Sequence, residues 1–332
     1  MMPGRGAGRP RALVAKATKA ERARERQKAG TLQELRVSAR TAKRYTRALE
    51  TFFRWAHSDG RHLPHNVDDL DSFVSMYVET CWHEGEGRSK ASDTLSALGW
   101  KSPKVRAHLA GAWHLIGAWQ RYELPTRAPP LPRDVFFAMA EHFTRLALPG
   151  VALAVLVGGH CVLRTTELAT LTFSQIEFAG DYTSAVVSLG VTKGGARRGA
   201  SESVTIELPW LAAAVKAASL NADPGDTLIG VSTSRFRTLF AQALDALNCA
   251  GWGFMPYSIR RGGATELWRV SGNLSKVTLR GRWGHASTTR VYVNDGLARL
   301  AEFKLPASPM KDLALAFSRR MQAPVALFER PL

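Results

Sequence analysis

The sequence predicts a mainly α-helical protein with a small β-hairpin, an α+β fold arranged in two domains. Apolar residues recur at helical spacing along most of the chain, two β-branched runs flank a Gly-rich loop, and four prolines between Pro125 and Pro132 interrupt regular structure. A chain of 332 residues with 45% apolar content can bury two separate cores. The prolines therefore mark the expected domain linker.

Basic residues dominate the charge balance. Forty-five Lys and Arg residues against 28 Asp and Glu residues give a formal charge of +17. This excess favours a polyanionic partner, with nucleic acid as the first expectation. Charge by itself does not separate a DNA enzyme from a ribosomal, chromatin or membrane-surface protein, so the choice depends on motifs.

Several classes of site are disfavoured. Cys81, Cys161 and Cys249 stand far apart without a C-x-x-C pair or clustered His residues, which argues against disulfides and zinc and fits a reducing compartment. Neither Gly-rich nucleotide-binding motif, G-x-x-x-x-G-K-[ST] or G-x-G-x-x-G, is present. The longest apolar stretch, Val151 to Leu163, is too short to span a bilayer. We therefore expect no metal, cofactor, nucleotide or membrane partner.

The first 30 residues indicate a flexible basic arm. They contain nine Lys or Arg residues, two acidic residues and few large apolar residues, so they cannot bury a core. Such an arm could be a nuclear localisation signal, a segment that contacts DNA phosphates, an organelle transit peptide or a solvated tail.

Residues 31–125 are expected to form a helical domain. Apolar residues at helical spacing predict one helix from about Ser38 to Ala56 and two more over Leu70–Cys81 and Val105–Trp119. The opposite side of the first helix carries a basic stripe at positions i, i+3, i+4 and i+7, made of Arg40, Lys43, Arg44 and Arg47. A solvated face is one reading of this stripe, but four like charges repel one another without an anion, which favours contact with phosphates.

After the linker, residues 126–133, the pattern predicts a second domain over residues 134–305 and a tail over residues 306–332. Helices are expected at Val135–Leu146 and Val151–Leu163, and strands at Ala185–Val191 and Ser203–Leu208. The tail contains an apolar segment, residues 313–317, that we expect to pack on its own domain or on a neighbouring subunit.

Two segments of the second domain place cationic groups where phosphate chemistry would use them. Arg164 follows an apolar helix, and Glu167 lies one turn later, so the pair is either a structural ion pair or an arginine fork fixed for a phosphate. Lys193 lies in the loop of the hairpin, where a lysine is usually solvated but can also donate a proton.

Two later segments add arginines and a tyrosine. Arg260 and Arg261 precede two glycines, and because adjacent side chains diverge on a helix, we expect only one of these arginines to point into a site. Tyr292 follows a run that contains Trp283 and His285. A lone tyrosine is more often a packed aromatic than a nucleophile.

Taken in chain order, these residues resemble the active site of the tyrosine recombinase and integrase family, over about residues 130–300. In that family an Arg-x-x-Glu-Leu element, a hairpin Lys, a His-x-x-Arg box, a His or Trp, and a nucleophilic Tyr make one site. The resemblance assigns these roles, in that order, to Arg164 with Glu167, to Lys193, to Arg260 and to Tyr292.

Two positions do not match the family pattern simply: one can be filled by either of two residues, and the other carries a different residue type. Trp283 lies nine residues before Tyr292, the usual interval, whereas His285 keeps the Gly-His pair at an interval of seven; we favour Trp283 because its indole N–H can donate to a phosphate oxygen. Tyr257 stands where the box normally has His, and a phenol is a poor base near neutral pH.

The resemblance implies a helical core-binding domain that clamps DNA and an integrase-type catalytic domain that cuts and rejoins strands through a 3′-phosphotyrosyl link, without metal or ATP. It also implies double-stranded DNA as partner and a tetramer on DNA. The sequence around Arg260 and Tyr292 looks especially like the recombinases of eukaryotic mobile elements, such as the crypton type. This resemblance implies localisation in the nucleus; a different source would imply the cytoplasm or nucleoid. A type IB topoisomerase, a non-catalytic descendant of a recombinase and a basic interaction module are the alternatives.

Overall fold

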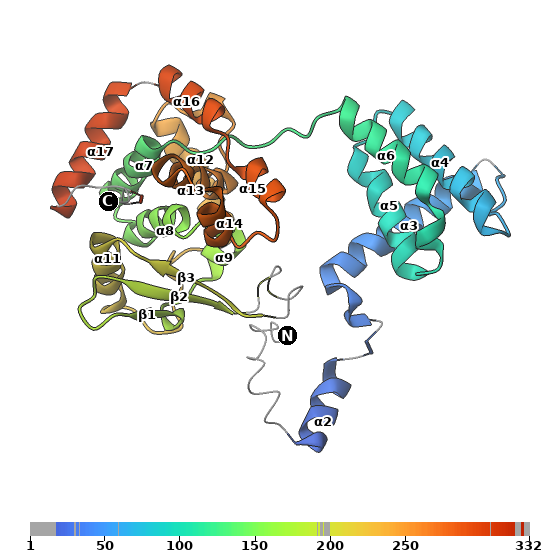
Figure 1. The fold of residues 1–332 in the computed structure, drawn as a ribbon, viewed down its shortest axis with the longest axis horizontal. Coiled ribbons are helices and arrows are strands. Elements are labelled where there is room, and N and C mark those ends of the chain that lie inside the picture. Colours follow the sequence, from blue (N-terminus) through green and yellow to red (C-terminus); the bar gives the residue numbers. More distant parts are fainter. Residues whose placement is uncertain are drawn as a thin grey trace. The chain divides into compact units, whose positions relative to one another are not determined.

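The computed structural model describes residues 18–29, 31–32, 34–58, 60–190, 192, 195, 200–305, 307–322 and 327–328. Within this part of the chain the contacts divide the protein after Thr126 into two compact units, and this boundary falls within the Pro-rich segment of the sequence (Figure 1). The structure is mainly helical with one small antiparallel sheet, which confirms the predicted fold class.

The N-terminal unit is a small helical domain with its own core. It contains α2 (Lys19–Ala29), α3 (Ala39–Ser58), α4 (Val67–His83), α5 (Arg88–Lys101) and α6 (Ala110–Tyr122), with short 3-10 turns η1 (Glu34–Arg36) and η2 (Val105–His108). Phe52, Tyr77 and Leu95 are buried at its centre, supplied by α3, α4 and α5 in turn. Ile116 and Trp119 of α6 join them, so four helices contribute to this core.

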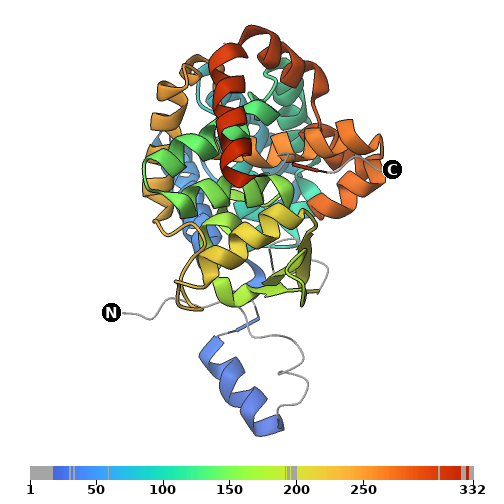
Figure 2. The same cartoon turned by 90° about the vertical axis from the view of Figure 1, so that its left-hand side faces the viewer.

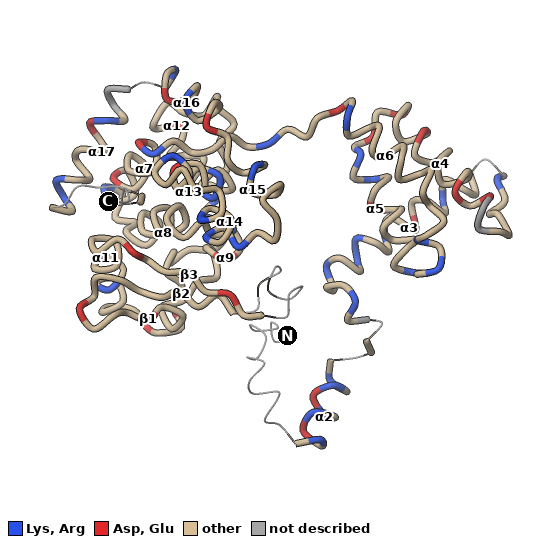
Figure 3. Tube along the Cα trace, viewed as in Figure 1, with Lys and Arg blue, Asp and Glu red and all other residues tan. Residues whose placement is uncertain are grey.

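Four details of this unit differ from the predicted elements. Helix α5 was not predicted, and the predicted helix from Val105 is interrupted, because α6 starts only at Ala110. Phe53 lies on the rim with 38% exposure and does not enter the core. Helix α2 lies inside the segment predicted to be a flexible arm, but it buries no residue, so its helical form reflects local composition alone (Figure 3).

The C-terminal unit is larger and carries the sheet. Its helices are α7 (Arg133–Arg145), α8 (Pro149–His160), α9 (Thr165–Thr170), α11 (Pro209–Ser219), α12 (Thr233–Ala246), α13 (Pro256–Ser271), α14 (Leu274–Gly281), α15 (Ala286–Tyr292), α16 (Asp295–Lys304) and α17 (Ala307–Met321), with 3-10 turns η3 (Phe173–Gln175) and η4 (Ala250–Trp252). Helices α7, α8 and α13 pack against one another at its centre (Figure 1).

The sheet has three antiparallel strands in the order β1 (Ile176–Phe178), β2 (Ala185–Gly190) and β3 (Glu202–Ile206). The sequence predicted β2 and β3 but not the short β1. Val187 lies opposite Ile176 on one side and Val204 on the other, and all three are buried, so this face of the sheet closes the core. The sheet lies at one edge of the domain, where α11 packs against β3 and α8 (Figures 1 and 2).

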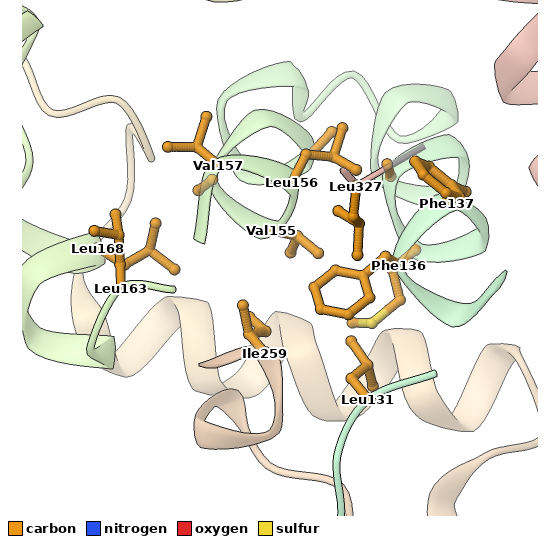
Figure 4. Close-up of a cluster of buried hydrophobic side chains, with 14 of the residues drawn as sticks. Leu131, Phe136, Phe137, Val155, Leu156, Val157, Leu163, Leu168, Ile259 and Leu327 are labelled. Carbon is orange, nitrogen blue, oxygen red and sulfur yellow. The ribbon is translucent and has the colours of Figure 1, made fainter. Parts of the chain in front are cut away.

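Two glycines allow close helix packing around the candidate arginines: Gly263 brings α13, which carries Arg260, against α8, and Gly159 of α8 packs against Phe136 of α7. A Cβ added at Gly263 would lie 2.0 Å from the carbonyl oxygen of Gly159, and a Cβ at Gly159 would lie 2.5 Å from the ring of Phe136. Larger residues would separate the helices. The apolar side chains of Figure 4, including Phe136, Val155 and Ile259, fill the space around this crossing.

The C-terminal segment, predicted as a tail over residues 306–332 with an apolar stretch that packs on its own domain or on a neighbouring subunit, lies against its own domain. Helix α17 packs along α7 (Figure 2), where Phe317 stacks on Phe137 with 6.1 Å between ring centres. Leu327 is fully buried, and its carbonyl accepts a 2.6 Å hydrogen bond from Nδ1 of His160. Of the two alternatives for the apolar segment, self-packing is the one observed.

In the described part of the chain, no helix is both long and apolar enough to cross a membrane.

Candidate active site

Arg164 belongs to a buried network of two arginines and two glutamates. It is the N-cap of α9, where Glu167 accepts bonds from its backbone N–H at 2.8 Å and from its guanidinium. Glu167 Oε2, which accepts from the backbone N–H, also pairs with Arg282 at 2.6 Å, and Glu202 lies 3.3 Å from Nε of Arg282. Because two carboxylates share Arg282, the network fixes the fork of Arg164 at the edge of the site while its side chain stays 27% exposed.

Arg282 reaches this network through an unusual backbone conformation. It ends α14 with φ of 57°, in the left-handed region that non-glycine residues rarely adopt. Its guanidinium is only 5% exposed, between α9 and the sheet. Burial lowers the pKa of Arg282, and the two glutamates oppose this effect. The turn therefore directs a third arginine beneath the site, a role that the sequence did not predict.

Arg260 is almost completely buried, with 1% exposure, on the first turns of α13. One terminal nitrogen donates to the carbonyl oxygen of Val162, and the other donates to that of Gly281 at 2.6 Å. Burial and the nearby charges of Arg282 and Arg164 lower its pKa to about 10, so it stays charged at neutral pH. A rigid buried cation beside a second arginine is suited to binding a phosphate.

Tyr292 lies at the end of α15 against three possible donors. Its ring centre is 4.4 Å from that of Trp283 and 5.7 Å from that of Tyr257, and the Arg260 guanidinium lies 5.3 Å from it. Burial raises the pKa of Tyr292, but a hydrogen bond from Tyr257, the charge of Arg260 and a hydrogen bond from Trp283 outweigh it, so the pKa is lowered overall. For Tyr257, burial and the bond to Tyr292 raise the pKa. Tyr292 is thus the more acidic of the two phenols.

The end of α15 is held in place by hydrogen bonds that involve three threonines. The Thr289 hydroxyl is buried and lies 2.8 Å from that of Thr278 on α14, and the backbone N–H of Asn294 donates to Thr265 on α13 at 3.3 Å. These bonds flank Tyr292 on both sides and set its distance from Arg260.

The structure therefore brings together Arg164, Glu167, Arg260, Trp283, Tyr257 and Tyr292. It places His285 differently: this residue is exposed at the N-terminus of α15.

Lys193 lies outside the described residues. The base of its loop is described, because the buried Thr192 donates to Glu202 and accepts from the backbone N–H of Gly195 at 3.1 Å. Glu202 thereby links the loop base to Arg282.

The basic stripe lies on the N-terminal unit. Arg40, Lys43, Arg44 and Arg47 are all exposed on α3, whereas Leu49 and Phe52 of the same helix are buried. Arg44 pairs with Asp93 of α5 at 3.3 Å. The described residues contain no cluster of three His, Cys, Asp or Glu side chains that could hold a metal ion.

Sequence reasoning missed the residues that support the site. Arg282 and Glu202 were not singled out, and the burial of Arg261, which is 3% exposed, was not predicted. The only signal for Arg282 was its place among three arginines within eleven residues, from Arg280 to Arg290. Spacing along the chain cannot show that a residue of a turn lies between glutamates eighty or more residues earlier.

The fold is shared with solved DNA recombination proteins. A lambda integrase dimer bound to a COC′ core site aligns with a TM-score of 0.54 at 13% identity, over 79% of this chain and 90% of that one. The Tn1549 transposon integrase in complex with circular intermediate DNA aligns with a TM-score of 0.53 at 13% identity, over 86% and 97%. The chain has the integrase fold.

A lambda integrase tetramer bound to a Holliday junction aligns with a TM-score of 0.51 at 12% identity, over 78% of this chain and 73% of that one. The sequence matches no protein-family model and no curated protein. The likeness to the integrase fold thus rests on architecture, and the chemistry must be argued from the residues of this chain.

Proposed function

We propose that this protein cuts and rejoins double-stranded DNA at specific sites, with Tyr292 as the nucleophile. The observation that carries this proposal is the position of Tyr292, whose ring centre lies 4.4 Å from that of Trp283, 5.7 Å from that of Tyr257 and 5.3 Å from the Arg260 guanidinium, at the edge of an arginine cluster. A tyrosine packed only for burial would not need three potential donors around it. The integrase fold adds support, since the aligned structures are DNA complexes.

The arginines bind the scissile phosphate. Arg260 and Arg164 neutralise the negative charge that grows on the non-bridging oxygens as Tyr292 attacks phosphorus, and the Trp283 indole adds a neutral donor. Glu167 and Arg282 hold Arg164 in position beforehand. Charge stabilisation by groups already in place is the largest contribution that a protein makes to such a transfer.

The reaction conserves the energy of the phosphodiester. Tyr292 gives up its proton to solvent and bonds to phosphorus, the bond from phosphorus to the 5′-oxygen breaks, and Lys193 protonates that oxygen, which leaves a 3′-phosphotyrosyl link and a free 5′-hydroxyl. Attack by a 5′-hydroxyl reverses these steps and rejoins a strand. No ATP is consumed, because one phosphoester replaces another.

The N-terminal unit supplies backbone contacts. The exposed stripe on α3 presents four cationic side chains to the phosphates of a duplex. The proposed assembly is a tetramer on DNA, in line with the tetrameric lambda integrase complex, and the proposed location is the nucleus if the chain comes from a eukaryotic mobile element.

The test uses supercoiled plasmids that carry random 40-base-pair inserts, without Mg²⁺ or ATP. Detergent denaturation should leave wild-type protein attached to a 3′ end, whereas Tyr292→Phe should leave none. Tyr182→Phe, an exposed tyrosine in the turn between β1 and β2, is the matched control and should behave as wild type.

The outcomes separate the alternatives. Sequencing of the captured ends gives the target site, and a defined product from two such sites supports recombination, whereas relaxation alone supports topoisomerase activity. Tight, site-dependent binding with no adduct would overturn the catalytic proposal in favour of a DNA-binding protein.

A further inference from the structure

Helix α13 buries two consecutive arginines, and the proposed reaction uses only the first. Successive residues on an α-helix point about 100° apart, so Arg260 and Arg261 face different surroundings. Arg260 enters the cluster with Trp283 and Tyr292. Arg261 is 3% exposed nevertheless, so its burial needs a separate explanation.

Arg261 lacks a counter-charge in the described part of the chain. Its Nε is buried without a hydrogen-bond partner there. The charged and titratable groups that act on it are Tyr257, Arg127 and Tyr292, and none of them is a carboxylate. A buried cation without an acceptor is costly, so this position is suited to an anion that arrives from outside.

The end of the linker is fixed next to this arginine. The backbone N–H of Leu131 donates to the carbonyl oxygen of Ser258 at 3.0 Å, and a Cβ at Gly262 would lie 2.2 Å from the carbonyl oxygen of Leu131. The linker backbone therefore lies directly on the first turns of α13. Arg127, four residues before Leu131, is exposed and repels Arg261, so the two cations share one side of Tyr292.

We propose that Arg261 and Arg127 bind a second phosphodiester of the DNA, adjacent to the one that Tyr292 attacks. This inference rests on the proposed function, because it takes the neighbouring phosphate of the same strand as the anion. Arg260 then holds the reacting phosphate and Arg261 holds the next one, so that consecutive residues of α13 fix consecutive charges of the strand. Arg261 acts as a positioning residue that sets the register of the strand against Tyr292.

The test uses a duplex selected by affinity from a random library and a set of copies in which one phosphate at a time is a neutral methylphosphonate. Arg261→Met and Arg127→Ala are each expected to weaken binding to the unmodified duplex about tenfold, the size of a lost charged hydrogen bond. On the copy neutralised at the adjacent phosphate, wild type should lose the contacts of both arginines, about 100-fold, whereas each variant should lose only the contact of its remaining arginine, about tenfold. The slope of log affinity against log salt should fall by about one for each variant.

Matched controls separate contact from folding. Arg319→Ala removes an exposed arginine of α17, on the far side of the domain from α15 (Figure 1), and should bind as wild type on every copy. Arg127 is exposed, so Arg127→Ala tests the inference even if Arg261→Met unfolds. Circular dichroism melts give the folded fraction.

Each outcome decides the inference independently of the reaction. Equal losses for wild type and variants at every neutralised phosphate, or an unchanged salt slope, would overturn it. Because these are binding measurements, they remain decisive if no phosphotyrosyl adduct forms. Conversely, a normal adduct with unaffected Arg261 and Arg127 variants would reject this second phosphate site and leave the proposed function intact.

Discussion

The indole of Trp283 lies against the phenol of Tyr292, with 4.4 Å between ring centres and 42° between ring planes. The same indole lies 4.7 Å from the guanidinium of Arg260. Gly281 permits this arrangement, because a Cβ there would fall 1.9 Å from Cζ3 of the indole. Its carbonyl oxygen also accepts from Arg260. One glycine thus sets the relative positions of three side chains.

Gly281→Ala should displace the Trp283 indole and slow formation of the phosphotyrosyl adduct. A shift of about 1 Å at a reacting centre costs on the order of 100-fold in rate, so a loss of that order is expected. Single-turnover adduct formation on a selected site measures it. Gly284→Ala is the control, since a Cβ there meets nothing within 4 Å and should leave the rate unchanged. Equal rates for the two variants would refute the spacing argument.

Tyr257→Phe should move the pH dependence of adduct formation upward. The rate should rise with pH as Tyr292 loses its proton, and the lowered pKa of Tyr292 places this rise below the range of an ordinary tyrosine. A hydrogen bond to a charged group is worth roughly 1.5–3 kcal/mol, so its removal should raise the midpoint by about 1–2 pH units. The control Tyr182→Phe should keep the wild-type midpoint. An unshifted profile for Tyr257→Phe would mean that this phenol does not act on Tyr292.

Arg282→Met should destabilise the C-terminal unit by about 3–5 kcal/mol, because it leaves Glu167 and Glu202 buried without their shared cation. Thermal unfolding followed by circular dichroism measures the change. The double variant Arg282→Met/Glu202→Gln should recover part of the loss, since one uncompensated carboxylate is gone. Arg290→Met, at an exposed position on α15, should melt as wild type. A loss for Arg282→Met no larger than that for Arg290→Met would contradict the network.

His160 should make stability depend on pH between about 6.5 and 4. Burial and the charge of Arg280 lower its pKa to about 4, while bonds to Leu327 and the charge of Glu207 oppose the shift. The unfolded chain therefore binds more protons than the folded chain in this window, so stability is present above pH 6.5 and is lost as pH falls. The total loss should be on the order of 3 kcal/mol.

Melting temperatures at pH 7.5 and 4.5 test this dependence. His160→Gln, which has no titrating ring, should show a smaller difference between the two pH values than wild type does. His285→Gln, at an exposed histidine, should keep the full difference. If His160→Gln retains the wild-type difference, another group is responsible.

Local pattern predicted the five helices α3, α4, α6, α7 and α8, but it gave no bounds for α5, α9 or the helices from α11 onward. Helix α5 buries Ala91, Ala97 and Gly99, small residues that give little periodic contrast. Helix α6 starts late because Asp71 of α4 accepts from the backbone N–H groups of Gly111 and Ala112 at 2.8 and 2.9 Å. A carboxylate forty residues earlier thus sets the residue at which α6 begins, and no local pattern contains that information.

The resemblance gave the order of the candidate residues, and the structure gave their distances. The resemblance placed Arg164, Arg260 and Tyr292 in one active site. In the structure these three residues lie close enough for their charges to interact. The sequence offered both Trp283 and His285 for the family's His-or-Trp position, because their distances along the chain from Tyr292 allowed two alignments. In the structure Trp283 contacts Tyr292, whereas His285 faces solvent. The turn at Arg282 makes this difference, because it directs residue 283 inward before α15 begins.

The sequence by itself determined the helical class, the Pro-rich division, the basic stripe of α3 and the chain order of the candidate site, because each depends on spacing within a few turns of one element or on residue type. Only the tertiary structure decided the burial of Arg261 and Arg282 and the packing of α17 on its own domain. Those features depend on contacts between residues far apart in the chain. The close crossing of α8 and α13 at Gly159 and Gly263 brings such residues together, and no periodicity along the chain specifies it.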